Sequence, residues 1–372
     1  YNGTGEWKLL NSSTHHWGRL PVSSEKGHEI KLVVSDGSKE DSTSVILPVD
    51  RATVYPLKKV GMRFKGVNYI IGHRFEDPLY SPTSEPEMKE SFEVIRDDLG
   101  CNAIKLVGDY EDVLVKAAEI AIEKGFKMII VSPRYWHKTA TEDYTIEEHA
   151  EKVTLFSKRA EELRKKSNAI VLCIGEELDF SVRGITNSST YEKRVEEYSA
   201  MTSKQKNDIV LSKLRNYLST MIREVRKYFH GRITYAHTGS TAYLFNYAEF
   251  DLDIVGPMLY WYPDEKGFNR KVAQFKVPEK LYVSTEFGCH CWKGAMNVSG
   301  SAWQYYQGQE YSQEEQAVCI MRTMEVYLSH GLDGAFVYIW MKRQPNDARS
   351  YGIARFYGDG KFLTRKLGFY AY

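Results

Sequence analysis

The sequence predicts an α/β protein, a (β/α)8 barrel that carries a small N-terminal β-rich appendage. Three observations lead to this prediction. The chain has 372 residues, more than the roughly 250 that such a barrel typically takes. From Val60 onward, short β-branched apolar runs alternate with longer amphipathic stretches, which is typical of βα units and a parallel sheet. There are eight such runs, whereas an open doubly wound sheet commonly has about five or six strands.

Residues 1–58 have a different character. Segments 29–35 and 44–49 are short β-type runs, and the polar stretch between them is rich in turn-forming residues. No residue pattern in this part suggests chemistry. We therefore expect a β-rich appendage over residues 1–58 and the catalytic barrel over residues 59–372.

The expected barrel strands, in chain order, are residues 61–70, 103–107, 127–131, 169–174, 233–236, 254–259, 281–285 and 334–340. The expected helices between them are residues 85–99, 112–124, 146–166, 206–229 and 313–330. Residues 180–207 are polar and rich in Ser and Thr, so we expect a long loop inserted after the fourth strand, on the side where barrels form their sites.

The charge balance argues against several classes of partner. Lys and Arg number 50 and Asp and Glu 49, so the net charge is +1 and no long-range field attracts nucleic acid or an anionic membrane. No apolar run approaches the ~18 residues of a membrane span. No G-x-G-x-x-G motif follows the first strand, which disfavours a dinucleotide-binding fold.

The five cysteines are an odd number and cannot all pair. Cys101, Cys173 and Cys319 lie in or beside apolar runs, and we expect them to be small buried hydrophobic residues. Cys289 and Cys291 flank a histidine, which raises the alternative of a metal site. Three adjacent residues cannot all reach one ion without a strained loop, so we predict no metal and no other cofactor.

Two strand ends carry carboxylates. The fourth strand closes with Glu176 and Glu177, and the seventh with Glu286. The C-terminal ends of barrel strands meet at one mouth, where catalytic groups sit. Two carboxylates there suit glycoside hydrolysis, in which one protonates the leaving oxygen and the other attacks or directs water. The alternative is that these acidic residues are solvated caps, but their pairing and the apolar run before each favour the catalytic interpretation.

With Tyr260 at the end of the sixth strand and Trp340 at the end of the eighth, these residues resemble the clan A glycoside hydrolases, which are retaining enzymes on a TIM barrel. The resemblance covers about residues 60–372, and segments 173–178, 222–226 and 233–236 are most similar to the β-mannanases of family 113. It implies that Glu177 is the acid/base and Glu286 the nucleophile of a double displacement through a covalent glycosyl intermediate. Retention further implies carboxyl groups about 5–5.5 Å apart, against about 6.5–9.5 Å for inversion.

Two positions depart from the clan. Most members have Asn where this chain has Glu176, and that Asn donates to the sugar hydroxyl at carbon 2. An ionised carboxylate only accepts, so either the hydroxyl donates or the substrate carries a cationic amino group there. Many members have Arg where this chain has Lys105, which is a point charge without the two-pronged geometry of Arg. The alternative for Lys105 is an inward barrel lysine paired with an acid such as Asp109.

The aromatic content is high, with 7 Trp, 26 Tyr and 16 Phe. Five of the tryptophans, Trp303 among them, lie at or just after C-terminal strand ends, where indole faces can stack on sugar rings; the alternative is that they pack the core. His237 ends the fifth strand in the same way. The predicted substrate-binding residues are therefore Glu176, Tyr260, Trp340, His237, Trp136, Trp261, Trp292 and Lys105.

We thus predict a retaining glycoside hydrolase that cleaves β-linked polysaccharide or oligosaccharide of the β-1,4-mannan or glucan type. Two alternatives stay open: an exo-acting β-glycosidase on amino-sugar substrates, and a catalytically silent carbohydrate-binding barrel. The expected partner is a carbohydrate, with no nucleic acid and no membrane; the oligomeric state is left open. Because polysaccharides are met outside the cell, we expect an extracellular or secreted protein.

Overall fold

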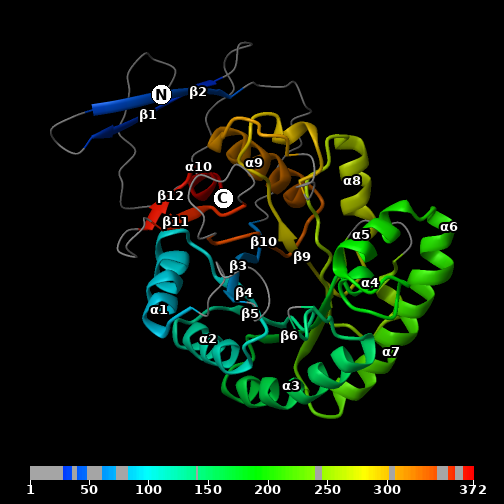
Figure 1. Cartoon of the computed structure of the whole chain (residues 1–372). Helices are drawn as coiled ribbons and strands as arrows, with labels where there is room; N and C mark the ends of the chain where they lie inside the picture. Colours follow the sequence, from blue (N-terminus) through cyan, green and yellow to red (C-terminus); the bar gives the residue numbers. More distant parts are fainter. Residues whose placement is uncertain are drawn as a thin grey trace. The chain divides into compact units, whose positions relative to one another are not determined.

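The computed structural model describes residues 28–35, 40–47, 61–72, 83–139, 141–238, 245–300, 306–341, 351–356 and 363–372 (Figure 1). The chain divides into two compact units, Tyr1–Lys59 and Val60–Tyr372. In the first unit, β1 (His28–Ser35) and β2 (Glu40–Leu47) form an antiparallel pair in which His28 lies opposite Leu47.

The second unit is a closed barrel of eight parallel strands (Figure 1). The ring closes where β10 pairs with β3, and neighbours along the ring follow the order of the chain. The strands are β3 (Phe64–Gly72), β4 (Ala103–Gly108), β5 (Met128–Pro133), β6 (Ile170–Glu176), β7 (Arg232–Ala236), β8 (Ile254–Val255), β9 (Leu281–Phe287) and β10 (Gly334–Val337). All eight predicted strands and the (β/α)8 fold are confirmed, although β8 and β10 end earlier than expected.

Helices surround the barrel in Figure 1. They are α1 (Glu85–Glu93) with the π-helical turn η2 (Val94–Asp98), α2 (Glu111–Glu123), α3 (Ile146–Lys166), η3 (Lys206–Leu211) with α7 (Ser212–Arg226), α8 (Glu265–Gln274), α9 (Gln313–Ser329) and α10 (Leu367–Ala371). Three begin at hydroxyl caps: the side chains of Ser84, Thr145 and Ser312 accept hydrogen bonds from backbone amides of the first turn. None of the described helices is long and apolar enough to cross a bilayer.

The remaining short elements are η4 (Tyr247–Glu249), η5 (Ala295–Asn297) and the antiparallel pair β11 (Ala354–Phe356) and β12 (Leu363–Arg365).

The segment after β6 is helical, so the prediction of a long loop there is wrong. It forms α4 (Leu178–Ser181), α5 (Tyr191–Ala200) and α6 (Ser203–Gln205). Two of its threonines are N-caps: Thr190 accepts from the amide of Lys193, and Thr202 forms a capping box. The buried Arg194 then ties α5 down, since it donates to Phe180 O at 2.7 Å and to Asp143 Oδ2 at 2.7 Å. Hydroxyl residues thus start helices here.

The barrel interior and the layer between barrel and helices are separate apolar clusters. The interior one is Phe64, Ala103, Met128, Ile130, Val171, Cys173, Ala236, Ile254, Met258, Val283 and Phe336. Because side chains alternate along a strand, residues two positions beyond these point inward as well. Lys105 on β4 and Ser132 on β5 follow Ala103 and Ile130 in this way.

Cys289 and Cys319 form a disulfide, so Cys319 is buried as expected but is also paired. The bond ties the segment directly after β9 to α9. Cys101, Cys173 and Cys291 form no disulfide and are buried. No local pattern predicts this pair, because Cys319 lies within α9, 30 residues from its partner.

Candidate active site

Both strands that carry the predicted carboxylates are irregular at their C-terminal ends. The register of β6 against β7 shifts between Cys173 and Glu176, and the pairing of β9 with β10 shifts before Phe287. Strict alternation from the inward Cys173 and Val283 would turn Glu176 and Glu286 outward. A shift of one residue reverses the face on which a side chain lies, and both carboxylates therefore point into the barrel mouth.

Lys105 joins these two carboxylates. Its Nζ lies 2.7 Å from Glu176 Oε1 and 2.8 Å from Glu286 Oε1. The lysine is fully buried, and both glutamates are buried with it. Burial acts to lower the pKa of Lys105, but the two carboxylates outweigh it and the pKa is raised, so the side chain is a permanent cation. Of the two alternatives weighed for Lys105, the ion pair forms, and its acids are the strand-end glutamates.

Each carboxylate oxygen of Glu286 accepts a hydrogen bond. Lys105 Nζ donates to Oε1 at 2.8 Å and Tyr260 OH donates to Oε2 at 3.0 Å. Burial and the charge of Glu176 together raise the pKa of Glu286 above its ordinary value, while the charges of Lys105 and Arg134 act to lower it. Both donors favour the ionised carboxylate, because a protonated acid would lose one of its two acceptor positions.

Glu177 has a different environment. It is partly exposed, and its backbone is left-handed, with φ 48° and ψ 34°, a conformation that non-glycine residues adopt at a cost and often at functional sites. Its amide donates to Ala236 O at 2.9 Å. No residue in the described part of the chain donates to its carboxyl group. Burial, followed by the charges of Glu286 and Asp179, raises its pKa to about 8, so at neutral pH it carries a proton.

Arg134 and Trp136 lie next to this cluster, after β5. The guanidinium carbon of Arg134 is 3.4 Å from the centre of the Trp136 ring, which stacks on Tyr191 with ring centres 5.6 Å apart. The charge of Arg134 acts to lower the pKa of each of the three glutamates, although the pKa values of Glu177 and Glu286 are raised overall. Trp136 is therefore packed against Arg134 and Tyr191, beside the carboxylates.

Besides Lys105, Glu176 and Trp136, a further four of the predicted binding residues are buried. The ring of His237 stacks on Phe245 at 4.3 Å, and burial lowers its pKa to about 3, which keeps it neutral. Trp261 donates to Met296 O at 3.0 Å, and Trp292 stacks on His290 at 4.2 Å. The expectation that Trp340 ends the last strand is wrong: β10 ends at Val337, and Trp340 is only 1% exposed. Trp303 lies outside the described residues.

Sequence reasoning assigned no role to several residues near the carboxylates. Ser132 Oγ donates to Glu176 Oε1 at 2.7 Å, and alternation from Ile130 could have found it. Tyr338, directly after β10, and Tyr351 are partly exposed and form edge-on ring pairs with Tyr260, with centres 6.5 and 5.9 Å apart. No local pattern marks these two tyrosines, since the contact is made only in the folded chain.

The described residues include no group of three or more His, Cys, Asp or Glu side chains that is arranged to hold a metal ion.

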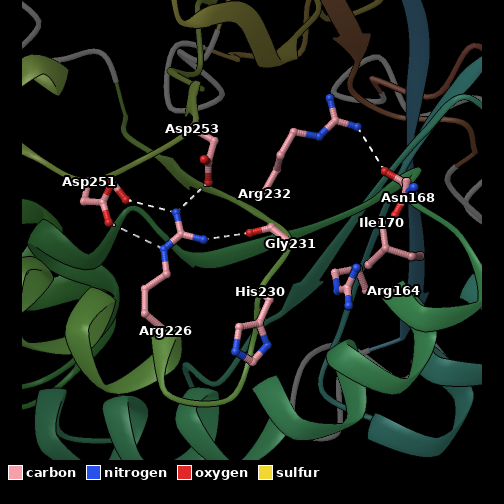
Figure 2. A pocket seen from close by; sticks show the side chains of 9 residues that line it. All are labelled: Arg164, Asn168, Ile170, Arg226, His230, Gly231, Arg232, Asp251 and Asp253. Carbon is pink, nitrogen blue, oxygen red and sulfur yellow. Dashed lines mark hydrogen bonds and ion pairs between the residues drawn. The ribbon is translucent and has the colours of Figure 1, made fainter.

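A pocket of about 380 Å³ lies at the start of β6 and β7, away from the carboxylates (Figure 2). Figure 2 shows three arginines around it, and their charges are used within the protein. Arg226 pairs with Asp253 at 2.6 Å and Arg164 with Glu161 at 2.7 Å, while Arg232 donates to Asn168 O at 3.2 Å. All three arginines of this pocket thus have partners within the protein.

No protein-family model and no curated protein sequence matches this chain. Among solved structures, it is similar to a GH113 β-1,4-mannanase, with a TM-score of 0.55 and 14% identity over 79% of this chain and 95% of that chain. It is also similar to a Ruminococcus gnavus β-glucuronidase, with a TM-score of 0.50 and 14% identity over 88% of this chain but 54% of that one. For a Bacteroides uniformis β-glucuronidase the values are 0.50 and 15%, over 79% of this chain and 33% of that one. The chain thus has the (β/α)8 fold of these glycoside hydrolase structures.

Proposed function

We propose that the chain is a retaining glycoside hydrolase that cleaves β-linked polysaccharide or oligosaccharide of the β-1,4-mannan or glucan type. The observation that carries this proposal is the contrast between two carboxyl groups at one barrel mouth. Glu286 accepts hydrogen bonds from Lys105 and Tyr260, whereas Glu177 has no donor among the described residues and a pKa raised to about 8. One group suits an ionised nucleophile and the other a general acid.

In the first step, a Glu286 oxygen attacks the anomeric carbon while Glu177 gives its proton to the leaving glycosidic oxygen. A glycosyl ester on Glu286 results. In the second step, Glu177, now ionised, removes a proton from water, the water oxygen attacks the same carbon, and Glu286 leaves as a carboxylate. Lys105 and Tyr260 stabilise the negative charge that returns to Glu286.

The fold comparisons support this class of reaction. The GH113 protein with a TM-score of 0.55 is a β-1,4-mannanase, and the Ruminococcus gnavus protein with a TM-score of 0.50 is a β-glucuronidase. The disulfide between Cys289 and Cys319 supports an oxidising location, and hence the proposal that the protein acts outside the cell. A silent binding barrel is disfavoured, since simple binding requires no pair of glutamates in such contrasting surroundings.

A second candidate, exo-cleavage of amino sugars, is favoured by one observation. Glu176 stands directly before the proposed acid and is ionised by its contact with Lys105, and an ionised carboxylate attracts an ammonium group. Mannan, glucan, xylan and chitosan substrates separate the two candidates.

The test is a hydrolysis screen over these four polysaccharides and their oligosaccharides, with proton NMR of the first product formed. We expect a β anomer first, and loss of nearly all activity in Glu286→Ala. In Glu177→Ala, activated aryl glycosides should be spared relative to polysaccharide, because their leaving groups need little protonation. An α anomer as first product, near-normal turnover of Glu286→Ala, or no hydrolysis of any substrate would overturn the proposal.

A further inference from the structure

Lys366 and Cys291 contact each other in the interior of the second unit. Lys366 Nζ donates to Cys291 Sγ at 2.9 Å, although the two residues are 75 positions apart in the chain. The lysine is only 2% exposed, and the cysteine is fully buried. Cys291 belongs to the segment that follows β9, and Lys366 directly precedes α10. The contact therefore joins two segments that only the fold brings together.

Backbone hydrogen bonds hold both residues in place. The carbonyl of Cys291 accepts from the amide of Ser312 at 2.8 Å, and the amide of Lys366 donates to Ile353 O at 3.0 Å. Lys366 Nζ also lies 5.9 Å from the centre of the Tyr311 ring. Because the main chain is anchored on both sides, the nitrogen and the sulfur stay within reach of each other in the folded protein.

This contact has the chemistry of an oxidation site. The thiolate is the form of cysteine that peroxides oxidise, and a neighbouring ammonium group stabilises a thiolate. The ammonium group of Lys366 is placed to do this for Cys291. The first product of peroxide and a thiolate is a sulfenic acid, which reacts further with a neighbouring nucleophile. Here the neighbouring group is the nitrogen of Lys366.

The other two cysteines that form no disulfide differ, because the lysines near them are engaged elsewhere. Burial raises the pKa of Cys101 to about 12, and the neighbouring Lys65 donates to a backbone carbonyl at 2.7 Å. Burial also raises the pKa of Cys173 to about 11, and Lys105 nearby holds the two strand-end glutamates. Both cysteines are therefore neutral thiols at neutral pH, which are less reactive than a thiolate. At Cys291, by contrast, a lysine nitrogen contacts the sulfur itself.

We propose that Cys291 and Lys366 are a redox modification site, at which hydrogen peroxide links Sγ to Nζ through one bridging oxygen atom. In the first step the sulfur takes one oxygen from peroxide, the O–O bond breaks, and a sulfenic acid and one water form. In the second step the sulfenic hydroxyl and the amine each lose one hydrogen, an N–O bond forms, and a second peroxide is reduced to two waters. Together, the thiol and the amine lose four electrons, which the two peroxides take up.

The bridge ties the segment after β9 to the start of α10. The disulfide between Cys289 and Cys319 already ties the same segment to α9. Disulfides form in oxidising surroundings, which this modification also requires. His290 contacts Tyr351 OH at 2.7 Å, and the Tyr351 ring pairs with Tyr260 beside the carboxylates. The bridge therefore stiffens a segment that contacts the candidate active site.

The test treats the folded protein with hydrogen peroxide in the absence of reductant and then measures its intact mass, its unreduced peptides and its melting temperature. We expect a cross-link between Cys291 and Lys366 that adds the mass of one oxygen atom less two hydrogens. The melting temperature should rise by about 2–4 °C, because a cross-link restricts the unfolded chain. Dithiothreitol should release the linked peptides with their unoxidised masses, since it returns the four electrons, whereas sulfinic and sulfonic acids persist.

Three variants define the site. Cys291→Ser removes the sulfur and keeps a hydrogen-bond acceptor of similar size, so it should form no cross-link and show no rise in melting temperature. Lys366→Arg keeps a cation beside the sulfur but removes the amine, and dimedone should then trap a sulfenic acid at Cys291. Cys101→Ser is the matched control, at another buried cysteine without a disulfide, and should form the cross-link as the natural protein does. Circular dichroism reports whether each variant folds, and Cys291→Ser carries the test if Lys366→Arg does not.

Three results overturn the inference. They are the absence of a cross-link in the folded natural protein after peroxide treatment, oxidation of Cys291 to sulfinic or sulfonic acid in place of the cross-link, and the same mass gain in Cys291→Ser. None of these measurements uses hydrolase activity, so this inference and the proposed function can fail independently of each other.

Discussion

Lys105 donates a hydrogen bond to Glu286 across the barrel mouth, from a position 181 residues earlier in the chain. The contact is 2.8 Å long, and the same nitrogen holds Glu176. One cation thus serves two buried carboxylates. Removing it leaves them facing each other in a region of low dielectric, which makes this lysine the most informative single residue of the site.

Lys105→Met should destabilise the fold by about 3–5 kcal/mol, because two buried acids lose their counter-charge. In whatever activity remains, the acid limb of the pH profile of kcat/KM should move to higher pH, since Lys105 acts to lower the pKa of Glu286. Lys105→Arg should restore part of the lost stability and should move the acid limb part of the way back. Lys165→Met, which removes an exposed ion pair with Glu162, should cost less than about 1 kcal/mol. Urea unfolding and pH-rate measurements check these values, and an unshifted acid limb contradicts the role of Lys105.

Tyr260→Phe should lower kcat/KM by about 10–100-fold, because Glu286 Oε2 loses the donor that lies 3.0 Å away. The ring stays, so the fold should be retained, as circular dichroism would show. Tyr228→Phe, at an exposed tyrosine near Lys158, should leave the rate unchanged. Equal rates for the Tyr260 variant and the natural protein would mean that this phenol does not stabilise the nucleophile.

The raised pKa of Glu177 predicts how activity changes with pH. As the general acid it must carry its proton, so kcat/KM for an unactivated substrate should fall as the pH rises through about 8. The measurement is a pH-rate profile with an oligosaccharide. A rate that is flat to pH 10 would show that Glu177 is not the acid.

The same shift predicts how stability changes with pH. The pKa of Glu177 rises from an ordinary 4.5 to about 8 on folding, so between these values the folded state binds more protons than the unfolded state. Stability from this group is therefore complete at low pH and falls as the pH rises across the window. Glu177→Gln should be more stable than the natural protein by on the order of 1–3 kcal/mol at pH 8, with no difference near pH 4. Chemical unfolding at several pH values measures this, with Glu162→Gln as the exposed control. A constant difference between the Glu177 variant and the natural protein at all pH values would contradict the shift.

The disulfide predicts the number of reactive thiols. Alkylation of the denatured protein without reductant should modify Cys101, Cys173 and Cys291 only, and reduction should make all five cysteines reactive. The Cys289→Ala and Cys319→Ala double variant should lose about 2–4 kcal/mol of stability, as expected for a loop closed over 30 residues. Mass spectrometry and thermal unfolding give both values. Five modified cysteines before reduction would exclude the bond.

The sequence pattern alone predicts the barrel and the strand ends that carry the candidate catalytic residues. Alternation of apolar runs and amphipathic stretches is a local property, and it located all eight strands and the positions of Glu177 and Glu286. The pattern did not predict the helices between β6 and α7, because the Ser and Thr residues that cap them are also typical of loops. There Thr190 and Thr202 start helices, and one contact of the buried Arg194 that stabilises α5 is made with Asp143, 51 residues earlier in the chain.

Which side chains come into contact depends on the tertiary structure. Period-two alternation from Cys173 and Val283 turns Glu176 and Glu286 outward, and the register shifts that reverse this depend on the neighbouring strands. Other features also depend on residues that lie far apart in the chain. They are the ion pairs of Lys105 with both glutamates, the disulfide between Cys289 and Cys319, and the burial of Trp340. Local sequence sets backbone preference, but the side chain that a buried group contacts is set by packing, so the chemistry of the candidate site became visible only in the folded barrel.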